Sequence, residues 1–147
     1  MLREAKTSDA QLLYEWVNSA DSLAASLITS NPIPWDEHCD WLATKIADPG
    51  SIIWIAKTGG QVAGSIRLVT KSTELEIAIY VDPAMRKSGI ALSMLKKARE
   101  TARADGMHLP LIARILRKNK ASLRLFEKAG YRFDKDHADH IVLRLNK

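Results

Sequence analysis

The residues best suited to chemistry form a short glycine-containing loop, Arg86-Lys87-Ser88-Gly89-Ile90-Ala91, which follows a strand-like pattern and runs into a helical one. Main-chain N–H groups at the start of a helix point outward, and the helix dipole favours negative charge there. Glycine lets an anion approach the main chain, and Arg86 and Lys87 add two cations. The spacings of a nucleoside-triphosphate P-loop and of a dinucleotide fingerprint are both absent. The loop therefore predicts an anion site that suits one pyrophosphate group.

The elements that must position this loop can be read from periodicity and turn residues. Along residues 73–81, Leu75 and Ile77 alternate with Glu74 and Glu76, which is the two-residue period of a strand. The order β-α-α-β-β-β-α-β-α-β-β predicts an α+β fold. The other expected strands span residues 2–6, 51–57, 61–70, 109–116, 131–133 and 140–145, and the expected helices begin at a Ser8–Gln11 capping box, at Pro34, after Gly89 and at Asn119.

Length and composition limit the class of protein. The chain has 147 residues, 46% hydrophobic and 27% charged, so we expect one domain spanning residues 1–147. Cys39 is the only cysteine, which excludes an intramolecular disulfide framework. No apolar run approaches the ~20 residues of a membrane span and no signal peptide is visible, so we expect a cytoplasmic protein. The formal charge of +5 suits nucleic acid, an anionic membrane or a phosphorylated small molecule equally.

Two motifs together resemble a known superfamily. Arg86, Gly89 and Ala91 match, in register, the Gln/Arg-x-x-Gly-x-Gly/Ala motif with which the GNAT N-acetyltransferases bind acyl-coenzyme A. Residues 119–131 resemble the same superfamily's Asn-x-x-Ser/Ala-x-x-x-Tyr/Phe-x-Lys-x-Gly-Phe/Tyr stretch. The resemblance covers nearly the whole chain and implies acetyl transfer from acetyl-CoA to a primary amine. It also implies the GNAT fold, a mixed and mainly antiparallel sheet of about seven strands flanked by about four helices.

The first third of the chain resembles one subgroup of that superfamily. This subgroup acetylates nucleotide-linked amino sugars, as in pseudaminic acid biosynthesis, and the ribosomal-protein-alanine N-acetyltransferases share part of its pattern. The resemblance implies an amino-sugar nucleotide as acceptor, with a protein N-terminus as the alternative. The matching segments are Trp16–Asn18, Ser26, Ile33, Trp35–Leu42, Gly64–Arg67 and Glu76–Ile79.

The resemblance also implies the catalytic groups. A free alkylamine titrates near ~10.4, so a base helps to deprotonate it. Glu76 is the preferred base, directly or through water, and Glu74 on the same strand face is the second candidate; both are equally explained as solvated surface residues. Many relatives carry a tyrosine where this chain has Phe126, and that hydroxyl protonates the departing thiolate. Phe126 has no proton to donate, so Tyr80, or a water held by Ser122, is the expected substitute.

The cofactor contacts follow from the same resemblance. Main-chain groups of Ile79 and Val81 would pair with the pantetheine arm, and a nearby N–H would stabilise the oxyanion of the thioester. Asn119 and Ser122 would reach the arm, and Asn119 is equally well explained as a helix N-cap. The implied cofactor-binding set is Ile79, Val81, Arg86, Lys87, Ser88, Gly89, Ile90, Ala91, Asn119, Ser122 and Phe126.

Three residues are candidates for binding the acceptor. Arg67 can pair with a substrate phosphate through two hydrogen bonds, although a strand arginine is also explained as a surface residue. His38 lies on the apolar side of its expected helix, where a buried and hydrogen-bonded histidine is the alternative, and Asn18 follows the first helix. His137 and His140 stand beside acidic residues in an expected turn, where we expect no metal.

Two other classes of function stay open. A nucleic-acid module would use Arg114, Arg117, Lys118 and Lys120, but no recognition signature is present and these residues also suit the surroundings of an anionic coenzyme. A non-catalytic acyl-coenzyme A sensor would bind the cofactor without turnover. We expect a small-molecule amine as partner, with no membrane and no nucleic acid, and the sequence leaves open whether the chain forms a homodimer.

Overall fold

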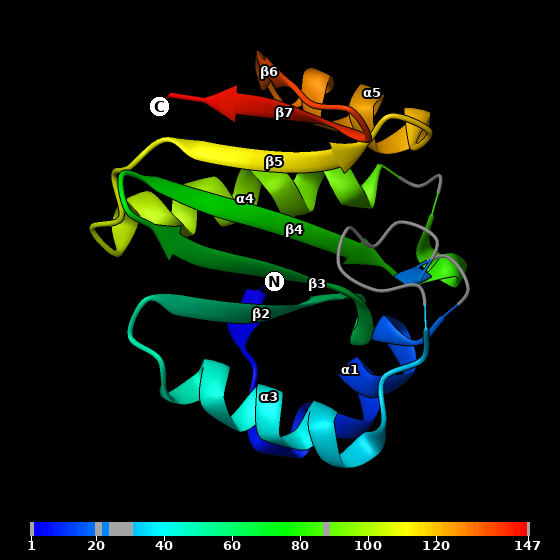
Figure 1. Cartoon of the computed structure of the whole chain (residues 1–147). Coiled ribbons are helices and arrows are strands. Elements are labelled where there is room, and N and C mark those ends of the chain that lie inside the picture. Colours follow the sequence, from blue (N-terminus) through cyan, green and yellow to red (C-terminus); the bar gives the residue numbers. More distant parts are fainter. Residues whose placement is uncertain (1, 20–21, 24–30, 87–88, 147) are drawn as a thin grey trace.

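The computed structural model of the chain describes residues 2–19, 22–23, 31–86 and 89–146 (Figure 1). Within these ranges no helix is both long enough and apolar enough to cross a membrane. The strands are β1 (Leu2–Glu4), β2 (Ser51–Thr58), β3 (Gln61–Lys71), β4 (Glu74–Val81), β5 (Leu111–Leu116), β6 (Arg132–Asp136) and β7 (His140–Leu145). The helices are α1 (Ala10–Val17), α3 (Trp35–Ala47), α4 (Ile90–Ala104) and α5 (Lys120–Lys128), with 3-10 turns at Thr7–Asp9 and Pro83–Met85.

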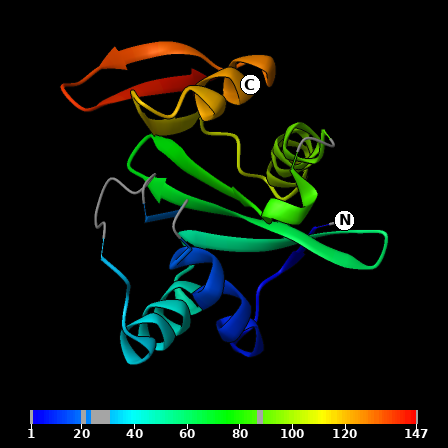
Figure 2. The ribbon, with the colours of Figure 1, turned by 90° about the vertical axis from the view of Figure 1, so that its right-hand side faces the viewer.

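All seven strands form one sheet in the order β1-β2-β3-β4-β5-β7-β6. Neighbouring strands are antiparallel except β4 and β5, which run parallel. Helices α1 and α3 cover one face of the sheet, and α4 and α5 cover the other (Figures 1 and 2). This arrangement confirms the expected α+β class and the expected mixed, mainly antiparallel sheet.

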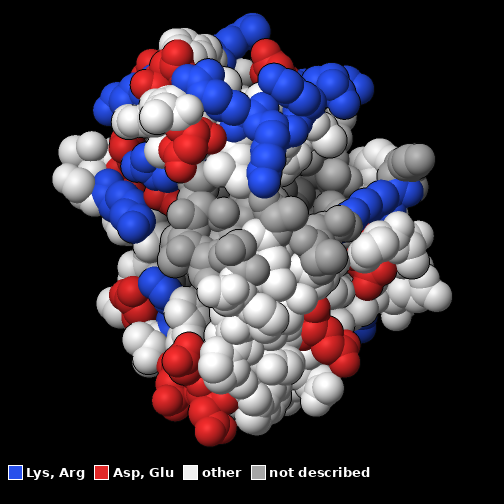
Figure 3. All heavy atoms as spheres, turned by 45° about the vertical axis from the view of Figure 1, so that its right-hand side comes forward, with Lys and Arg blue, Asp and Glu red and all other residues white. Residues whose placement is uncertain are grey.

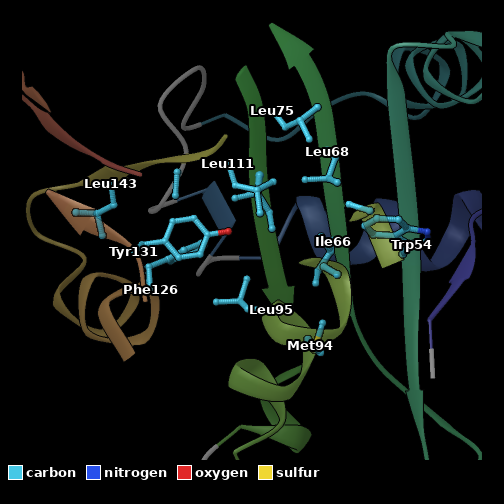
Figure 4. Packing of buried hydrophobic residues seen from close by; sticks show 14 of the residues in the cluster. Trp54, Ile66, Leu68, Leu75, Met94, Leu95, Leu111, Phe126, Tyr131 and Leu143 are labelled. Atoms are coloured by element: carbon cyan, nitrogen blue, oxygen red, sulfur yellow. The ribbon is translucent and has the colours of Figure 1, made fainter. Parts of the chain in front are cut away.

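The alternation along β4 decides which layer each side chain joins. Leu75 and Ile77 belong to the larger core on the side of α4 and α5. Figure 4 shows Leu75 in this core with Met94 and Leu95. Each fully buried side chain of this size stabilises the fold by ~1.5–3 kcal/mol. The intervening residues of β4 face the layer of α1 and α3, whose own core consists of Ala5, Leu13, Trp16, Leu42, Ile53 and Ile55.

Strands β3 and β4 approach each other closely at Gly64, which is paired with Val81. A Cβ atom on Gly64 would lie 2.0 Å from the carbonyl oxygen of Tyr80, and that obstacle is main chain. No other residue type fits there without separating the strands. Gly64 therefore keeps the carboxyl end of β4 attached to β3, at the point where β4 has already left β5.

The first helix begins differently from the prediction. The expected capping box of Ser8 and Gln11 is wrong, because a 3-10 turn precedes α1 and Asp9 holds that turn. The Asp9 carboxylate accepts a hydrogen bond from the main-chain N–H of Lys6 at 2.8 Å and is paired with Arg3 at 2.8 Å. The hydrogen bond from Arg3 is the main reason that the pKa of Asp9 is lowered. An ionised carboxylate binds these donors more strongly than a serine hydroxyl does.

Candidate active site

Strands β4 and β5 are hydrogen-bonded only where they begin. Their parallel pairing joins Leu75 to Leu111 and Glu76 to Ile112, and the strands then diverge toward their carboxyl ends (Figure 1). In the part of the chain that the structure describes, no strand pairs with this edge of β4 beyond Glu76. A strand edge with free N–H and C=O groups can receive an extended ligand as if it were another strand.

The hydrogen bonds show which main-chain groups of β4 face this opening. The N–H of Leu75 donates at 2.8 Å to the carbonyl of Pro110, which precedes β5, whereas the N–H of Asp82 donates at 2.8 Å toward β3. Successive residues of a strand turn their main-chain groups to opposite edges. The odd-numbered residues of β4 therefore face β5, so Ile79 and Val81, the two predicted main-chain contacts, both lie at the open edge.

The predicted anion loop joins the end of β4 to the start of α4. Gly89 immediately precedes the helix with a φ of +77°, a conformation that favours glycine, and a Cβ there would meet nothing within 4 Å. Gly89 has no side chain to cap this helix, and the main-chain N–H groups at a helix start suit an anion. Lys87 and Ser88, two further predicted contacts, lie outside the described residues.

Arg86 turns its guanidinium back toward β4. Its Nε donates to the carbonyl of Val81 at 2.9 Å, and its Cζ lies 5.6 Å from the centroid of the Tyr80 ring. The Tyr80 ring in turn lies 5.4 Å from the ring of Trp16, whose Nε1 donates to Asp82 at 3.1 Å. This series of contacts links the anion loop to α1 on the opposite face of the sheet.

The two acidic candidates lie on the face of β4 that looks toward the layer of α1 and α3. Glu76 accepts a hydrogen bond from Nε of Arg114 at 3.1 Å, and its side chain is 29% exposed. Glu74 is paired with Arg144, which also lies 3.9 Å from Asp134. Glu76 is the last β4 residue paired with β5, so it stands where the strands part, whereas Glu74 lies at their closed end.

Arg67 of β3 lies opposite Ala78, two residues beyond Glu76 along β4. Its guanidinium carbon is 5.3 Å from the centroid of the Trp41 ring. Burial lowers the pKa of Arg67, and the Glu76 carboxylate partly offsets that effect. Ala78 is small and exposed, so no large β4 side chain fills the surface between Glu76 and Arg67.

Asn18 and His38 have structural partners. The side-chain amide of Asn18 binds both main-chain groups of Ile33, with Nδ2 donating to the carbonyl at 3.0 Å and Oδ1 accepting from the N–H at 2.7 Å. His38 is 2% exposed, and its Nε2 lies 3.0 Å from the carbonyl oxygen of Ala10. His38 stacks on Trp41 at 5.9 Å between ring centroids, so it supports the ring beneath Arg67. Direct acceptor contacts of Asn18 and His38 remain predictions.

Helix α5 carries the second motif. The Oδ1 of Asn119 accepts from the N–H of Ser122 at 3.2 Å, which confirms its role as the N-cap. Phe126 is 3% exposed and meets Tyr131 edge-on, with ring centroids 5.0 Å apart (Figure 4). Phe126 thus belongs to the core beneath the sheet, and the cofactor contacts of Asn119, Ser122 and Phe126 remain predictions.

Positive charge gathers at the end of the molecule formed by β5, α5 and the β6–β7 pair, and negative charge at the end that carries α3 (Figure 3). The sequence interpretation of Arg114 and Arg117 as neighbours of the coenzyme remains a prediction, and the structure shows the protein partners of both. Arg114 is paired with Glu76, while Arg117 is paired with Asp136 and donates to the carbonyl of His137 at 3.1 Å. Both guanidiniums have protein partners, because β4 brings Glu76 to Arg114, and the end of β6 and the β6–β7 turn bring acceptors to Arg117.

Sequence reasoning missed the cations that hold the acidic candidates. The alternation in β5 does place Arg114 on the face opposite the buried Ala113 and Ile115. Its partner Glu76 becomes visible only with the parallel pairing of β4 and β5, which no local pattern encodes. The rings of His137 and His140 stack at 4.5 Å, and the described residues contain no group of three or more side chains placed to hold a metal ion.

Comparison with known proteins gives a family and a sequence relative. A family model described as an acetyltransferase (GNAT) domain matches residues 1–132. The "Putative phosphinothricin acetyltransferase YwnH" of Bacillus subtilis (strain 168) is 28% identical over 139 residues, which cover 88% of this chain and 82% of that protein.

Solved structures share the fold at low sequence identity. The ribosomal-protein-alanine N-acetyltransferase from Brucella melitensis has a TM-score of 0.81 at 23% identity and covers 99% of this chain and 98% of its own. The Campylobacter jejuni N-acetyltransferase PseH has a TM-score of 0.74 at 15% identity, with 99% and 96% covered. The yncA structure from Salmonella typhimurium with its cofactor acetyl-CoA has a TM-score of 0.78 at 21% identity, with 99% and 92% covered. These likenesses show the fold, and PseH is one neighbour among several.

Proposed function

This chain belongs to the acetyltransferase (GNAT) family, and we propose that its acceptor is a small primary amine carrying an anionic group, bound on the β4 face that presents Glu76 and Arg67. The chain is an N-acetyltransferase, and acetyl-CoA is its acetyl donor. The observation that carries the proposal is the unequal charge at this face, where the guanidiniums of Arg114 and Arg67 both act on one carboxylate. Among the described residues, Glu76 is the negative group that acts on these two guanidiniums, and an anionic group of the acceptor would balance the remaining positive charge.

Two features of the chain suit acetyl-CoA at the opening between β4 and β5. The open edge of β4 offers main-chain groups of Ile79 and Val81 to the amides of the pantetheine arm. The turn at Gly89 and the first N–H groups of α4 suit the pyrophosphate, with Arg86 close by as a cation. Bound acetyl-CoA supplies a thioester whose carbonyl carbon receives the amine and whose thiolate leaves.

Glu76 accepts the proton of the acceptor amine, directly or through one water. An alkylamine with a pKa near ~10.4 is mostly protonated at neutral pH, so it must lose a proton before it can attack. The Nε of Arg114 donates to Glu76 at 3.1 Å, and this hydrogen bond holds the carboxylate in place where β4 and β5 part. A main-chain N–H at the open edge of β4 stabilises the oxyanion that develops.

The departing thiolate needs little help in this site. A thiol titrates near ~8.5, so its anion is a moderate leaving group without a dedicated acid. Phe126 has no proton to give and is buried. Tyr80 carries the hydroxyl on this face of β4, and its ring lies beside that of Trp16 and the guanidinium of Arg86. We assign proton donation to Tyr80 or to a water bound near Ser122.

Arg67 is the group that selects the acceptor. Its guanidinium is partly desolvated against Trp41, so a phosphate or carboxylate bound there forms strong charge-assisted hydrogen bonds. A nucleotide-linked amino sugar brings such a group on its phosphates. Phosphinothricin, the compound in the name of the Bacillus subtilis relative, is an amino acid with an anionic phosphinate. A protein N-terminus carries no obligatory anion near its amine.

The test compares acceptors by the coenzyme A thiol released from acetyl-CoA. The panel contains a nucleotide-linked amino sugar, the same amino sugar without its nucleotide, phosphinothricin and a peptide with an N-terminal alanine. We expect turnover with the anionic amines, and we expect Arg67→Gln to raise their KM by about 10-fold or more, because a hydrogen bond to a charged group is lost. The KM for acetyl-CoA should stay unchanged.

The matched control is Arg132→Gln, which removes the same charge from an exposed position on β6. The proposal is overturned if the peptide is the preferred acceptor. It is also overturned if Arg67→Gln changes the KM of anionic and neutral amines by the same factor, or if Arg132→Gln has the same effect as Arg67→Gln.

A further inference from the structure

We propose that a cavity beside the second half of α4 binds a small oxyanion, a phosphate or carboxylate group, at a site separate from the opening between β4 and β5. The cavity measures about 390 Å³, and its lining includes Lys96, Arg99, Arg103, Ala129, Tyr131 and Leu145. This volume falls at the lower end of the roughly 300–1,000 Å³ of small-molecule sites. Arg103 stands about 20 Å along α4 from Ile90 at the anion loop, so the two sites do not overlap.

Two of the lining residues each carry a buried polar atom that has no hydrogen-bond partner among the described residues. These atoms are Nη2 of Arg103 and the hydroxyl oxygen of Tyr131. Tyr131 is 1% exposed, and its ring lies among the apolar side chains of Phe126, Leu95 and Leu111, none of which can satisfy the hydroxyl (Figure 4). Nearly all buried polar groups in proteins have a hydrogen-bond partner, so two such atoms on residues that line one cavity point to a missing one.

The Arg103 guanidinium is already held in position. Its Nη1 donates to the carbonyl of Met107 at 2.6 Å and to that of Leu109 at 2.9 Å, both in the segment that follows α4. Because these two hydrogen bonds fix Nη1, the direction of Nη2 is fixed as well, and Nη2 has no hydrogen-bond partner among the described residues. Both Nη2 of Arg103 and the Tyr131 hydroxyl have hydrogens to donate. The oxygen atoms of an oxyanion can accept a hydrogen bond from each of these donors.

The charge of the lining favours an anion over a water molecule. Lys96, Arg99 and Arg103 recur at three- and four-residue spacing and so share one side of α4, and Glu100 is the carboxylate among the lining residues. Burial lowers the pKa of Arg103, and the neighbouring Arg99 lowers it further. An oxyanion at Nη2 would offset both effects, whereas a neutral water would offset part of the burial effect and none of the charge of Arg99.

The first experiment is thermal unfolding of the whole chain with saturating coenzyme A, which keeps the anion loop at Gly89 occupied. Inorganic phosphate is compared with sodium chloride at equal ionic strength. Sodium citrate is compared with sodium chloride in the same way, to test a carboxylate ligand. We expect phosphate or citrate to raise Tm by about 2–4 °C more than chloride does, the shift of a bound ligand on a domain of this size. If neither oxyanion exceeds chloride, the cavity holds only water and the proposal is overturned.

Variants then locate the binding. Tyr131→Phe removes only an unpartnered hydroxyl, so it should fold normally and weaken the binding of the effective oxyanion by roughly 3–10-fold in calorimetric titration. Lys96→Gln should weaken it several-fold, whereas Lys97→Gln, the same charge loss at an adjacent residue of α4 that does not line the cavity, should leave it unchanged. Equal effects of Lys96→Gln and Lys97→Gln, or unchanged binding by Tyr131→Phe, would contradict this site.

Discussion

Arg86 donates a hydrogen bond from Nε to the main-chain carbonyl of Val81 at 2.9 Å. Val81 lies at the open edge of β4, so its carbonyl is one of the groups that we assign to the pantetheine arm. The same arginine stands in the motif assigned to the pyrophosphate. In the structure Arg86 therefore occupies part of the proposed cofactor path, and cofactor binding must exchange this hydrogen bond for one to the coenzyme.

This relationship predicts opposite effects of Arg86→Ala on two ligands. Coenzyme A should bind about 10-fold more weakly or worse, because a charged contact to its pyrophosphate is lost. Pantetheine, which has no pyrophosphate, should bind at least as tightly as to the wild type, because Arg86 no longer competes for the Val81 carbonyl. Isothermal titration calorimetry measures both, with Arg132→Ala as the control for lost positive charge. Parallel weakening of both ligands would show that Arg86 holds the edge of β4 open instead of occupying it.

The assignment of Glu76 as the base predicts a loss of turnover in Glu76→Gln. We expect kcat to fall by about 10²–10⁴, the range for a removed general base, while the KM for acetyl-CoA stays the same. Glu74→Gln is the matched control, because Glu74 shares the strand face and also has an arginine partner but lies at the closed end of β4 and β5. Steady-state kinetics with an active acceptor distinguish the two. A similar loss in both variants would mean that charge on this face, and no single base, supports the reaction.

The anion loop and the faces of β4 could be predicted from sequence because their causes are local. A glycine before a helix and a two-residue alternation act within a few residues, so the turn at Gly89 and the strand face of Glu76 agree with the structure, while their roles remain predictions. The partner of Glu76 could not be predicted, because Arg114 reaches it only through the parallel pairing of β4 with β5. Parallel strands need a long crossover, here α4, and no short pattern specifies their register.

Asn18 and His38 show a second limit of local patterns. Both residue types bind ligands as readily as they bind main chain, so only their surroundings decide between the two. Asn18 joins α1 to Ile33, which lies 15 residues away in sequence, and His38 is 28 residues from its partner Ala10. Their roles depend on the packing of α1 against α3, which hydrophobic periodicity indicates without giving any contact.

Gly64 predicts a large loss of stability on a minimal substitution. In Gly64→Ala the new Cβ would lie 2.0 Å from the main-chain oxygen of Tyr80, so β3 and β4 must separate. We expect the free energy of unfolding to fall by about 3 kcal/mol or more in urea denaturation. Gly50→Ala is the control, because its Cβ would lie 3.3 Å from Oδ1 of Asp48, a side-chain atom that can move, and its expected cost is about 1 kcal/mol or less. Comparable losses at the two positions would contradict the close approach at Gly64.

Buried His38 predicts that stability falls on mild acidification. Burial is the main reason that its pKa is lowered, and the hydrogen bond to the carbonyl of Ala10 opposes the shift only in part. Above pH ~6.5 the imidazole is neutral in both the folded and the unfolded chain, so its contribution is fully present. Below that pH the unfolded chain binds a proton that the folded chain does not, and the free energy of unfolding falls by up to ~1.4 kcal/mol per pH unit until the folded pKa is reached.

Urea denaturation between pH 5 and 8 measures this dependence. His38→Gln keeps a donor for the Ala10 carbonyl and has no titrating ring, so its stability should decline less than that of the wild type between pH 7 and 5. His108→Gln removes an exposed histidine after α4 and should keep the wild-type slope. If the slope persists in His38→Gln and disappears in His108→Gln, the acid-sensitive group is exposed and the packing of α3 against α1 does not depend on a neutral His38.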